Sequence, residues 1–191
     1  MGGIRHNRNA PMSILTYNEL VALVDSGAIE NVKPEYINGA SIDLTLADGF
    51  LVEGIPSEQR SLVQLGNKES PVMARVEGHL LLAPGDFALA ATEQIFHLPD
   101  DVAGHYMLKS SLARVGLQHL FAGFADPTWH GSALTLELQN VLRHHSLLLR
   151  PGDKIGQMVF WRGQPVPEEA SYATRGQYNA TPGVQQSKGV K

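Results

Sequence analysis

The sequence predicts a mainly β domain that begins with one short helix and ends in a polar C-terminal tail. From Val32 onward, short apolar runs are separated by Gly, Pro and Asn at short intervals, which is typical of an all-β chain. The pattern Leu-x-Pro-Gly-Asp occurs twice, at residues 82–86 and 149–153, and each copy leads into an apolar run. Two similar turn-and-strand units fit a distorted jelly-roll or β-barrel architecture.

Length and composition fit one folded domain. The chain has 191 residues, of which 43% are hydrophobic, too many for a disordered chain. The formal net charge of -4 gives no basic surplus for binding nucleic acid. Because the sequence shows no signal peptide or apolar span, we expect a cytoplasmic protein without a membrane partner.

The absence of cysteine narrows the chemistry. Because the chain contains no cysteine, it has no disulfide, no thiol nucleophile and no cysteine-ligated zinc site. Zinc deaminases with a His-x-Glu and Pro-Cys-x-x-Cys signature are excluded for the same reason. No His-Glu-x-x-His motif occurs, and the adjacent His144 and His145 would face opposite sides of a strand. We therefore expect no protein-held metal site and chemistry that is independent of zinc.

The chain divides into three parts. Residues 1–11 lack periodicity and are expected to be a disordered extension or a tag; residues 12–162 form the β domain; residues 163–191 form the tail. Thr16 and Glu19 have the spacing of a capping box, which predicts a helix start. Leu20, Leu23 and Val24 share one face of this helix, and Gly27 ends it. It is the single helix that the sequence predicts with a defined start and end.

Several strands follow. Residues 41–46 alternate apolar and polar side chains, whereas residues 54–77 are more polar and are expected to be loop with weak strands. Residues 80–91, 95–98 and 102–108 are predicted to supply further strands. In both Leu-x-Pro-Gly-Asp copies, Pro suits the first corner of a turn and Gly the second, where a positive φ is needed.

Residues 109–140 carry the side chains suited to polar chemistry. Lys109, Ser110, Ser111 and Arg114 bring cations and hydroxyls together, as a phosphate site requires, although an ordinary polar turn would have the same composition. Glu137 interrupts an apolar run. With a period of two, its side chain shares a strand face with Thr135 and Gln139, opposite three leucines, so the carboxylate is either solvated or directed into a polar cavity.

Three motifs occur in a defined order: Lys-Ser-Ser-Leu-Ala-Arg, then Ala-Gly-Phe-Ala-Asp, then Gly-x-x-Leu-x-Leu-Glu-x-x-Asn. Together they resemble the dCTP deaminase branch of the dUTPase-like family. The likeness extends from about residue 14 to residue 178, through residues 37–43 and 151–157. It implies a dUTPase-like fold with a C-terminal lid segment over the active site.

The resemblance implies a role for each site residue. Glu137 would be the catalytic acid–base, with Ser110 and Arg114 bordering the reacting base. Asp126 would meet the deoxyribose 3′-hydroxyl, although it also fits a turn before Pro127. The remaining substrate-binding residues implied are Lys109, Ser111, Leu112, Ala113, Thr135, Leu136, Gln157 and Tyr172. Gln157 also fits a solvent-facing strand position, and the tail also fits a mobile terminus.

The tail departs from the family pattern. Its usual Lys-Tyr followed by Gln is replaced by Gln177-Tyr178 followed by Thr181. Arg175 is a candidate for the missing charge. These differences affect the expected phosphate contacts of the lid more than the chemistry at Glu137.

The activity implied is hydrolytic deamination of dCTP to dUTP and ammonia, feeding dUMP and thymidylate synthesis. Mg²⁺ would be carried by the triphosphate, and the enzyme would be a homotrimer with active sites shared between subunits. Two alternatives stay open. Residues 122–124 also resemble bifunctional members that continue to dUMP and diphosphate. The second alternative is a non-catalytic nucleotide-binding regulator on the same fold. A pure dUTPase is disfavoured, because its glycine-rich C-terminal phosphate motif is not evident.

Overall fold

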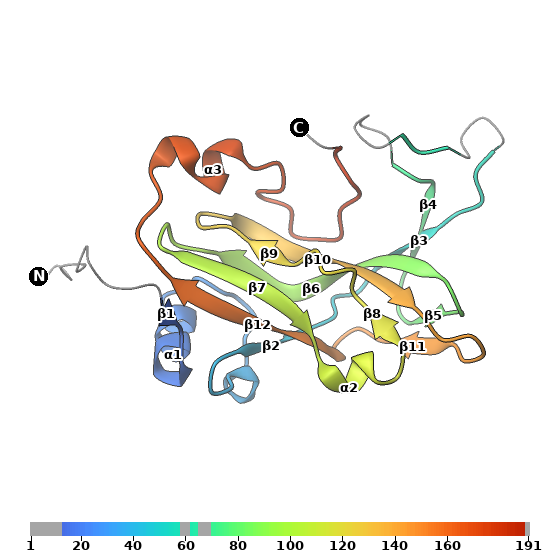
Figure 1. Ribbon diagram of the computed structural model, residues 1–191, viewed down its shortest axis with the longest axis horizontal. Coiled ribbons are helices and arrows are strands. Elements are labelled where there is room, and N and C mark those ends of the chain that lie inside the picture. The colour runs from blue at the N-terminus through green and yellow to red at the C-terminus, as the bar shows by residue number, and fades with distance from the viewer. Residues whose placement is uncertain (1–12, 58–61, 65–69, 190–191) are drawn as a thin grey trace, which may run out of the picture.

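The computed structural model describes residues 13–57, 62–64 and 70–189, and the expectation for residues 1–11 lies outside them. Two five-stranded sheets and one two-stranded sheet confirm the mainly β fold (Figure 1). All strand pairs in these described ranges are antiparallel. No helix in the same ranges is long and apolar enough to cross a membrane.

The strands have the following bounds. The first sheet contains β1 (Ser13–Ile14), β12 (Lys154–Arg162), β7 (Val102–Leu108) and β9 (Phe124–Ala125), with β2 (Ile42–Thr45) also paired to β12. The second contains β4 (Met73–Val76), β3 (Phe50–Glu53), β6 (Phe87–His97), β10 (His130–Asn140) and β8 (Leu117–Gln118). The third pairs β5 (Leu80–Leu82) with β11 (Leu147–Leu149).

The predicted N-terminal helix is present as α1 (Tyr17–Asp25). The Glu19 carboxylate accepts a hydrogen bond from the Thr16 backbone N–H at 2.9 Å, as a capping box requires. Gly27 follows with a φ of 80°, a conformation that glycine adopts without steric penalty. The capping box therefore predicted the start of this helix, and Gly27 predicted its end.

The described residues contain four further helical turns besides α1, the one helix that the sequence predicted with a defined start and end. They are the 3₁₀ turns η1 (Pro34–Tyr36) and η3 (Glu168–Ala170), and the one-turn helices α2 (Ser110–Ala113) and α3 (Tyr172–Arg175). A segment of three or four residues is too short to show a helical period, so the sequence pattern could not reveal them.

The repeated turns form as predicted. Gly85 and Gly152 have φ values of 86° and 82°. The Asp86 and Asp153 carboxylates each accept a backbone N–H at 3.0 Å, which closes the turn. The strands before the two turns, β5 and β11, pair with each other, so the two units lie side by side.

Two predicted strand boundaries were wrong. The expected strand 80–91 is interrupted by the turn at Gly85, and β6 then continues without a break through Thr92 and Gln94. The β10 pairing shifts at this point, because Ala133 lies opposite Ile95 while the next registered pair joins Thr135 to Ala91. The Thr92 hydroxyl accepts the Leu134 N–H at 3.0 Å, so a side chain replaces the lost ladder bond.

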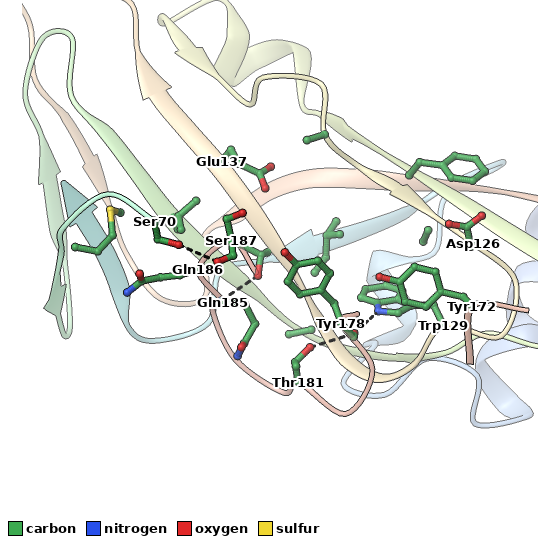
Figure 2. Close-up of a pocket in the computed structure, with 18 of the residues that line it drawn as sticks. Ser70, Asp126, Trp129, Glu137, Tyr172, Tyr178, Thr181, Gln185, Gln186 and Ser187 are labelled. Carbon is green, nitrogen blue, oxygen red and sulfur yellow. Dashed lines mark hydrogen bonds between the residues drawn. The ribbon is translucent and has the colours of Figure 1, made fainter. Parts of the chain in front are cut away.

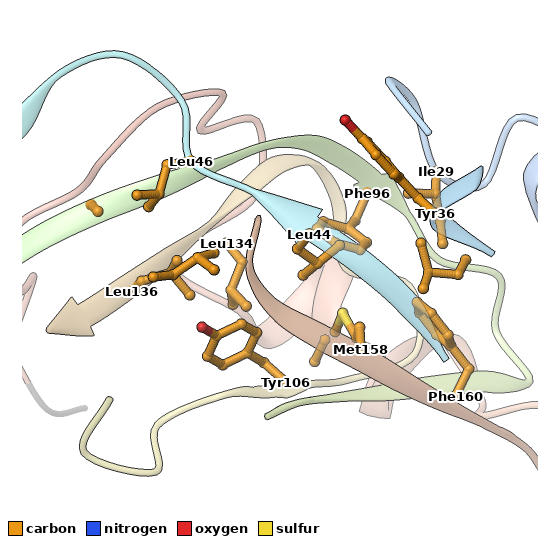
Figure 3. Close-up of a cluster of buried hydrophobic side chains, with 14 of the residues drawn as sticks. Ile29, Tyr36, Leu44, Leu46, Phe96, Tyr106, Leu134, Leu136, Met158 and Phe160 are labelled. Carbon is orange, nitrogen blue, oxygen red and sulfur yellow. The ribbon is translucent and has the colours of Figure 1, made fainter. Parts of the chain in front are cut away.

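The core lies between the two larger sheets, because side chains from both contribute to one buried cluster (Figure 3). Leu44, Met158 and Phe160 come from the first sheet, and Leu134 and Leu136 from the second.

Tyr106 of β7 crosses this core at the point where β12 carries Gly156. The ring is 1% exposed. A Cβ added at Gly156 would lie 2.5 Å from the Tyr106 hydroxyl oxygen and still closer to ring carbons. Residue 156 must therefore lack a side chain for the ring to keep its position.

We expect Gly156→Ala to lower the free energy of unfolding by about 1–3 kcal/mol, because the added methyl overpacks the core against Tyr106. Urea denaturation followed by fluorescence would measure it. Gly163→Ala is the matched control, since no heavy atom lies within 4 Å of the Cβ it would add. Equal unfolding midpoints for the two variants would contradict the prediction.

Candidate active site

A cavity of about 410 Å³ lies between the second sheet and the C-terminal segment (Figure 2). Its lining residues are Ser70, Pro71, Met73, Phe87, Leu89, Ala122, Phe124, Ala125, Asp126, Trp129, Ala133, Leu134, Thr135, Glu137, Tyr172, Tyr178, Thr181, Gln185, Gln186 and Ser187. The lining is largely apolar, with two carboxylates, and this combination is typical of a small-molecule site.

Strand β10 carries Glu137 and Thr135 into the cavity. Leu136 and Leu138 are buried on the opposite face, and the antiparallel pairing with β6 places Glu137 opposite Leu89. The predicted alternation along this strand is therefore present. It resolves the open alternative for Glu137, whose half-buried side chain lines a cavity instead of facing open solvent.

Burial gives Glu137 an unusual affinity for protons. It raises the pKa of the Glu137 carboxyl to about 7, because the charged form is disfavoured away from water. Both protonation states are then populated near neutral pH. A carboxyl in this condition can take a proton and return it within one reaction, as a general acid–base must.

Asp126 is the second carboxylate of the cavity. It follows β9, and its turn is closed by a backbone bond from the Trp129 N–H to the Asp126 carbonyl at 3.2 Å. The side chain is therefore not required to form the turn. Burial raises the pKa of Asp126. In Figure 2, Glu137 and Asp126 lie on either side of the Tyr178 ring.

The C-terminal segment crosses the cavity and is fastened to its rim. The Tyr178 carbonyl accepts the Trp129 indole N–H at 2.8 Å and the Ser132 hydroxyl at 2.7 Å. The Ala133 N–H donates to the Thr181 carbonyl at 3.0 Å. Further along, the Gln185 N–H donates to the Thr135 hydroxyl at 3.1 Å, and the Ser70 hydroxyl to the Ser187 carbonyl at 2.8 Å. The segment thus occupies the position of a lid.

The structure separates the predicted site residues into two groups. Asp126, Thr135, Glu137 and Tyr172 line one cavity, while the Leu136 side chain is in the core. Residues 109–114 and Gln157 are absent from the described lining. Helix α2 lies along the lower edge of Figure 1, and the C-terminal segment along the upper edge.

The second group gathers around a buried carboxylate. The Lys109 Nζ lies 2.6 Å from an Asp43 oxygen, and Gln157 is the strand partner of Asp43. Ser110 on α2 and Arg114 directly after it are exposed. One chain therefore brings the Glu137 carboxylate and the predicted phosphate cluster to two different places.

The cavity also contains residues that the sequence did not suggest. Trp129 and Thr181 line the cavity, and Ser132 holds the C-terminal segment beside it, through hydrogen bonds to partners 46 to 49 residues distant. Nothing local in the sequence could show such contacts. Tyr178 carried a usable signal, because an aromatic side chain in a polar tail has a reason to dock.

Comparison with known proteins identifies the family. A family model described as dCTP deaminase-like matches residues 14–163. A protein of Nocardioides sp. named "dCTP deaminase, dUMP-forming" is 35% identical over 182 residues, covering 88% of this chain and 93% of its own. A protein of the same name from Acidothermus cellulolyticus is 36% identical over 172 residues, covering 84% of this chain and 85% of its own.

A solved structure shares the fold. The 2′-deoxycytidine 5′-triphosphate deaminase from Agrobacterium tumefaciens aligns with a TM-score of 0.65 and 17% identity, over 81% of this chain and 49% of that longer chain. Since the family model spans most of the sequence and the curated relatives match over nearly their full length, the chain belongs to the dCTP deaminase-like family.

Proposed function

We propose that this protein converts dCTP to dUMP in two hydrolytic steps. The first gives dUTP and ammonia, and the second gives dUMP and diphosphate. The observation that carries the first step is Glu137, a half-buried cavity carboxyl whose pKa is raised to about 7. The second step is supported by the names of the curated relatives, which are dUMP-forming. These names favour the bifunctional alternative, in which dUMP is the final product, over an enzyme that stops at dUTP.

In the deamination step, water attacks C4 of the cytosine while the Glu137 carboxylate takes a proton from it. As the water adds, the electron pair of the C4–N3 double bond moves to N3. The bond from C4 to the amino group then breaks as Glu137 returns its proton to the leaving nitrogen, and the proton of the new hydroxyl passes to N3 as the C4 carbonyl forms. Ammonia departs and uracil remains. Such proton transfer contributes about 10²–10⁴-fold to a rate. In the second step, another water attacks the α-phosphorus, and the bond to the β-phosphate oxygen breaks.

The proposal includes a homotrimer whose active sites are shared. No lysine or arginine is among the described lining residues of the Glu137 cavity, yet a triphosphate needs cations. The cations would come from Lys109 and Arg114 of a neighbouring copy, which with Ser110 and Ser111 form the group called here the α2 cluster. Phe121 and Phe124 support a contact surface beside the cavity, since they are 77% and 63% exposed.

Magnesium enters the proposal as an ion carried by the triphosphate. The described ranges hold no group of three or more His, Asp or Glu side chains that could form a metal site. Oxygen ligands from the phosphates and water suit Mg²⁺. Its role would be to screen phosphate charge, and the proposed deamination routes no step through a metal.

The test is incubation of the purified protein with dCTP and Mg²⁺, followed by chromatography of nucleotides and an assay for diphosphate. Equal amounts of ammonia, dUMP and diphosphate would support both steps. Accumulation of dUTP alone would refute the second step. No release of ammonia would refute the deaminase itself.

We expect kcat/KM for deamination to fall as the pH is lowered through about 7, because the base must be ionised. At pH 5, about 1% of a group with a pKa of about 7 is ionised, whereas an ordinary Glu would remain mostly ionised. The pH–rate profile, with kcat and KM measured separately, would check this. A flat profile between pH 5 and 7 would contradict it.

The expected fall in kcat/KM at low pH does not come from a loss of stability caused by protonation of Glu137. Its pKa is higher in the folded state than its ordinary value, so the folded state binds more protons between those two values. The contribution of Glu137 to stability therefore grows as the pH falls through this window. Thermal unfolding at pH 5 would serve as the control.

A further inference from the structure

Asp43 is a buried carboxylate at the junction of three strands. Its side chain is 5% exposed. One oxygen accepts the Lys109 Nζ at 2.6 Å and the Asn38 amide at 2.9 Å, and the other accepts the Lys154 Nζ at 2.9 Å. A buried carboxylate is expensive to desolvate unless it is paired in this way.

The strand pairing explains why these side chains meet. Asp43 on β2 lies opposite Gln157 on β12, and Lys154 begins β12. Lys109 follows β7, and its backbone N–H bonds to the Ile155 carbonyl of β12 at 3.3 Å. Lys109 is also the residue before α2. Asp43 thus ties the start of α2 to two strands.

Two lysines share one carboxylate, so a positive charge remains uncompensated within this group. Burial raises the pKa of Asp43, but the hydrogen bonds from Lys109, Lys154 and Asn38 together lower it by more. The net effect is a lowered pKa. The two lysine side chains are 29% and 41% exposed, and an anion can reach both. The Lys154 Nζ also lies 4.7 Å from the centre of the Tyr36 ring, which restrains it on a second side.

A lysine side chain has high rotational freedom, and immobilising it weakens binding. Here Asp43 already holds the Nζ groups of Lys109 and Lys154 in place, and Lys109 directly precedes the serines of α2. Lys154 is a residue that the sequence did not suggest.

We propose that Asp43 is a positioning residue that holds Lys109 and Lys154 ready for the substrate triphosphate, and that Lys154 is a further phosphate-binding residue. The proposal rests on the nucleotide substrate of the proposed function. The proposal predicts the direction in which anion affinity changes when Asp43 is removed. If Asp43 acted only through its charge, its removal would strengthen anion binding, whereas loss of positioning weakens it.

The experiment measures binding of inorganic tripolyphosphate to the full chain by calorimetry, together with kcat and KM for dCTP. Asp43→Asn is expected to weaken tripolyphosphate binding about fivefold or more and to raise KM similarly, with kcat changed less than twofold. Lys154→Met is expected to weaken binding at least as much, and Lys154→Arg to restore most of it. In the double variant Asp43→Asn with Lys154→Met, the fold-loss of tripolyphosphate affinity should not exceed the product of the two single fold-losses. The reason is that both substitutions remove the same Asp43–Lys154 contact.

Asp101→Asn is the matched control. Asp101 is another buried carboxylate of this fold, 3.0 Å from Arg162 at the far end of β12. Its loss should leave tripolyphosphate binding within twofold. Thermal unfolding of each variant shows whether it is folded, and the two Lys154 variants test the proposal if Asp43→Asn is not.

The outcomes are separable. Unchanged or tighter binding by Asp43→Asn would overturn the proposal, as would an equal loss in Asp101→Asn. Failure of the wild-type protein to bind tripolyphosphate would overturn it as well. Binding of tripolyphosphate without turnover of dCTP would instead refute the proposed function and leave the positioning role supported.

Discussion

Glu137→Gln is expected to lower the deamination rate about 10²–10⁴-fold while nucleotide affinity stays within a few-fold. The amide has nearly the same shape as the carboxyl, so the cavity keeps its form. It cannot accept the proton from the attacking water at neutral pH. The loss should therefore appear in kcat, because the group acts in the transition state.

Single-turnover deamination and equilibrium binding of dCTP would separate the two effects. Glu53→Gln is a suitable control, since Glu53 is an exposed carboxylate that ends β3 and is absent from the described cavity lining. It should retain full activity. More than about 10% residual deamination in Glu137→Gln would exceed what the loss of a general base allows. Asp126 would then be the next candidate for the base.

Mixing two inactive variants is expected to recover activity. If Glu137 of one chain and Arg114 of its neighbour complete one site, Glu137→Gln and Arg114→Ala complement each other in mixed trimers. Random assembly from equal amounts leaves about one quarter of the sites with both native residues. The variants would be denatured together and refolded, the trimers confirmed by native mass spectrometry, and the activity compared with each variant alone.

A second mixture gives the matched control. Glu137 and Asp126 line the same cavity of one chain, so Glu137→Gln mixed with Asp126→Ala leaves every cavity with one defect. No recovery is expected there. If confirmed mixed trimers of the first pair also stay inactive, each site lies within a single chain, and the shared-site proposal fails.

The features predicted well from sequence depend on neighbouring residues. The capping box at Thr16, the positive φ at Gly85 and Gly152, and the alternation around Glu137 are all determined within a few positions. The break expected between residues 91 and 95 does not occur, because the irregular pairing of β6 there is set by a hydroxyl on one strand and an N–H on another.

The candidate site could be predicted only as separate motifs. Local patterns pointed to Glu137, Asp126 and the α2 cluster, but not to the distance between them. Asp43 drew no attention as a site residue, since a carboxylate in an alternating strand has no visible partner until Lys109 and Lys154 fold onto it. Long-range polar contacts of this kind need a tertiary structure to be recognised.

The fastening of the C-terminal segment has a consequence for the timing of catalysis. The segment meets the rim through backbone and hydroxyl groups, from Tyr178 to Ser187. When it lifts, each of these groups exchanges its partner for water, at a net cost of about 0.5–1.5 kcal/mol per bond. Each single contact therefore stabilises the docked segment only weakly. A segment that is docked by several individually weak hydrogen bonds can close over a reacting nucleotide and still release product without a separate source of energy.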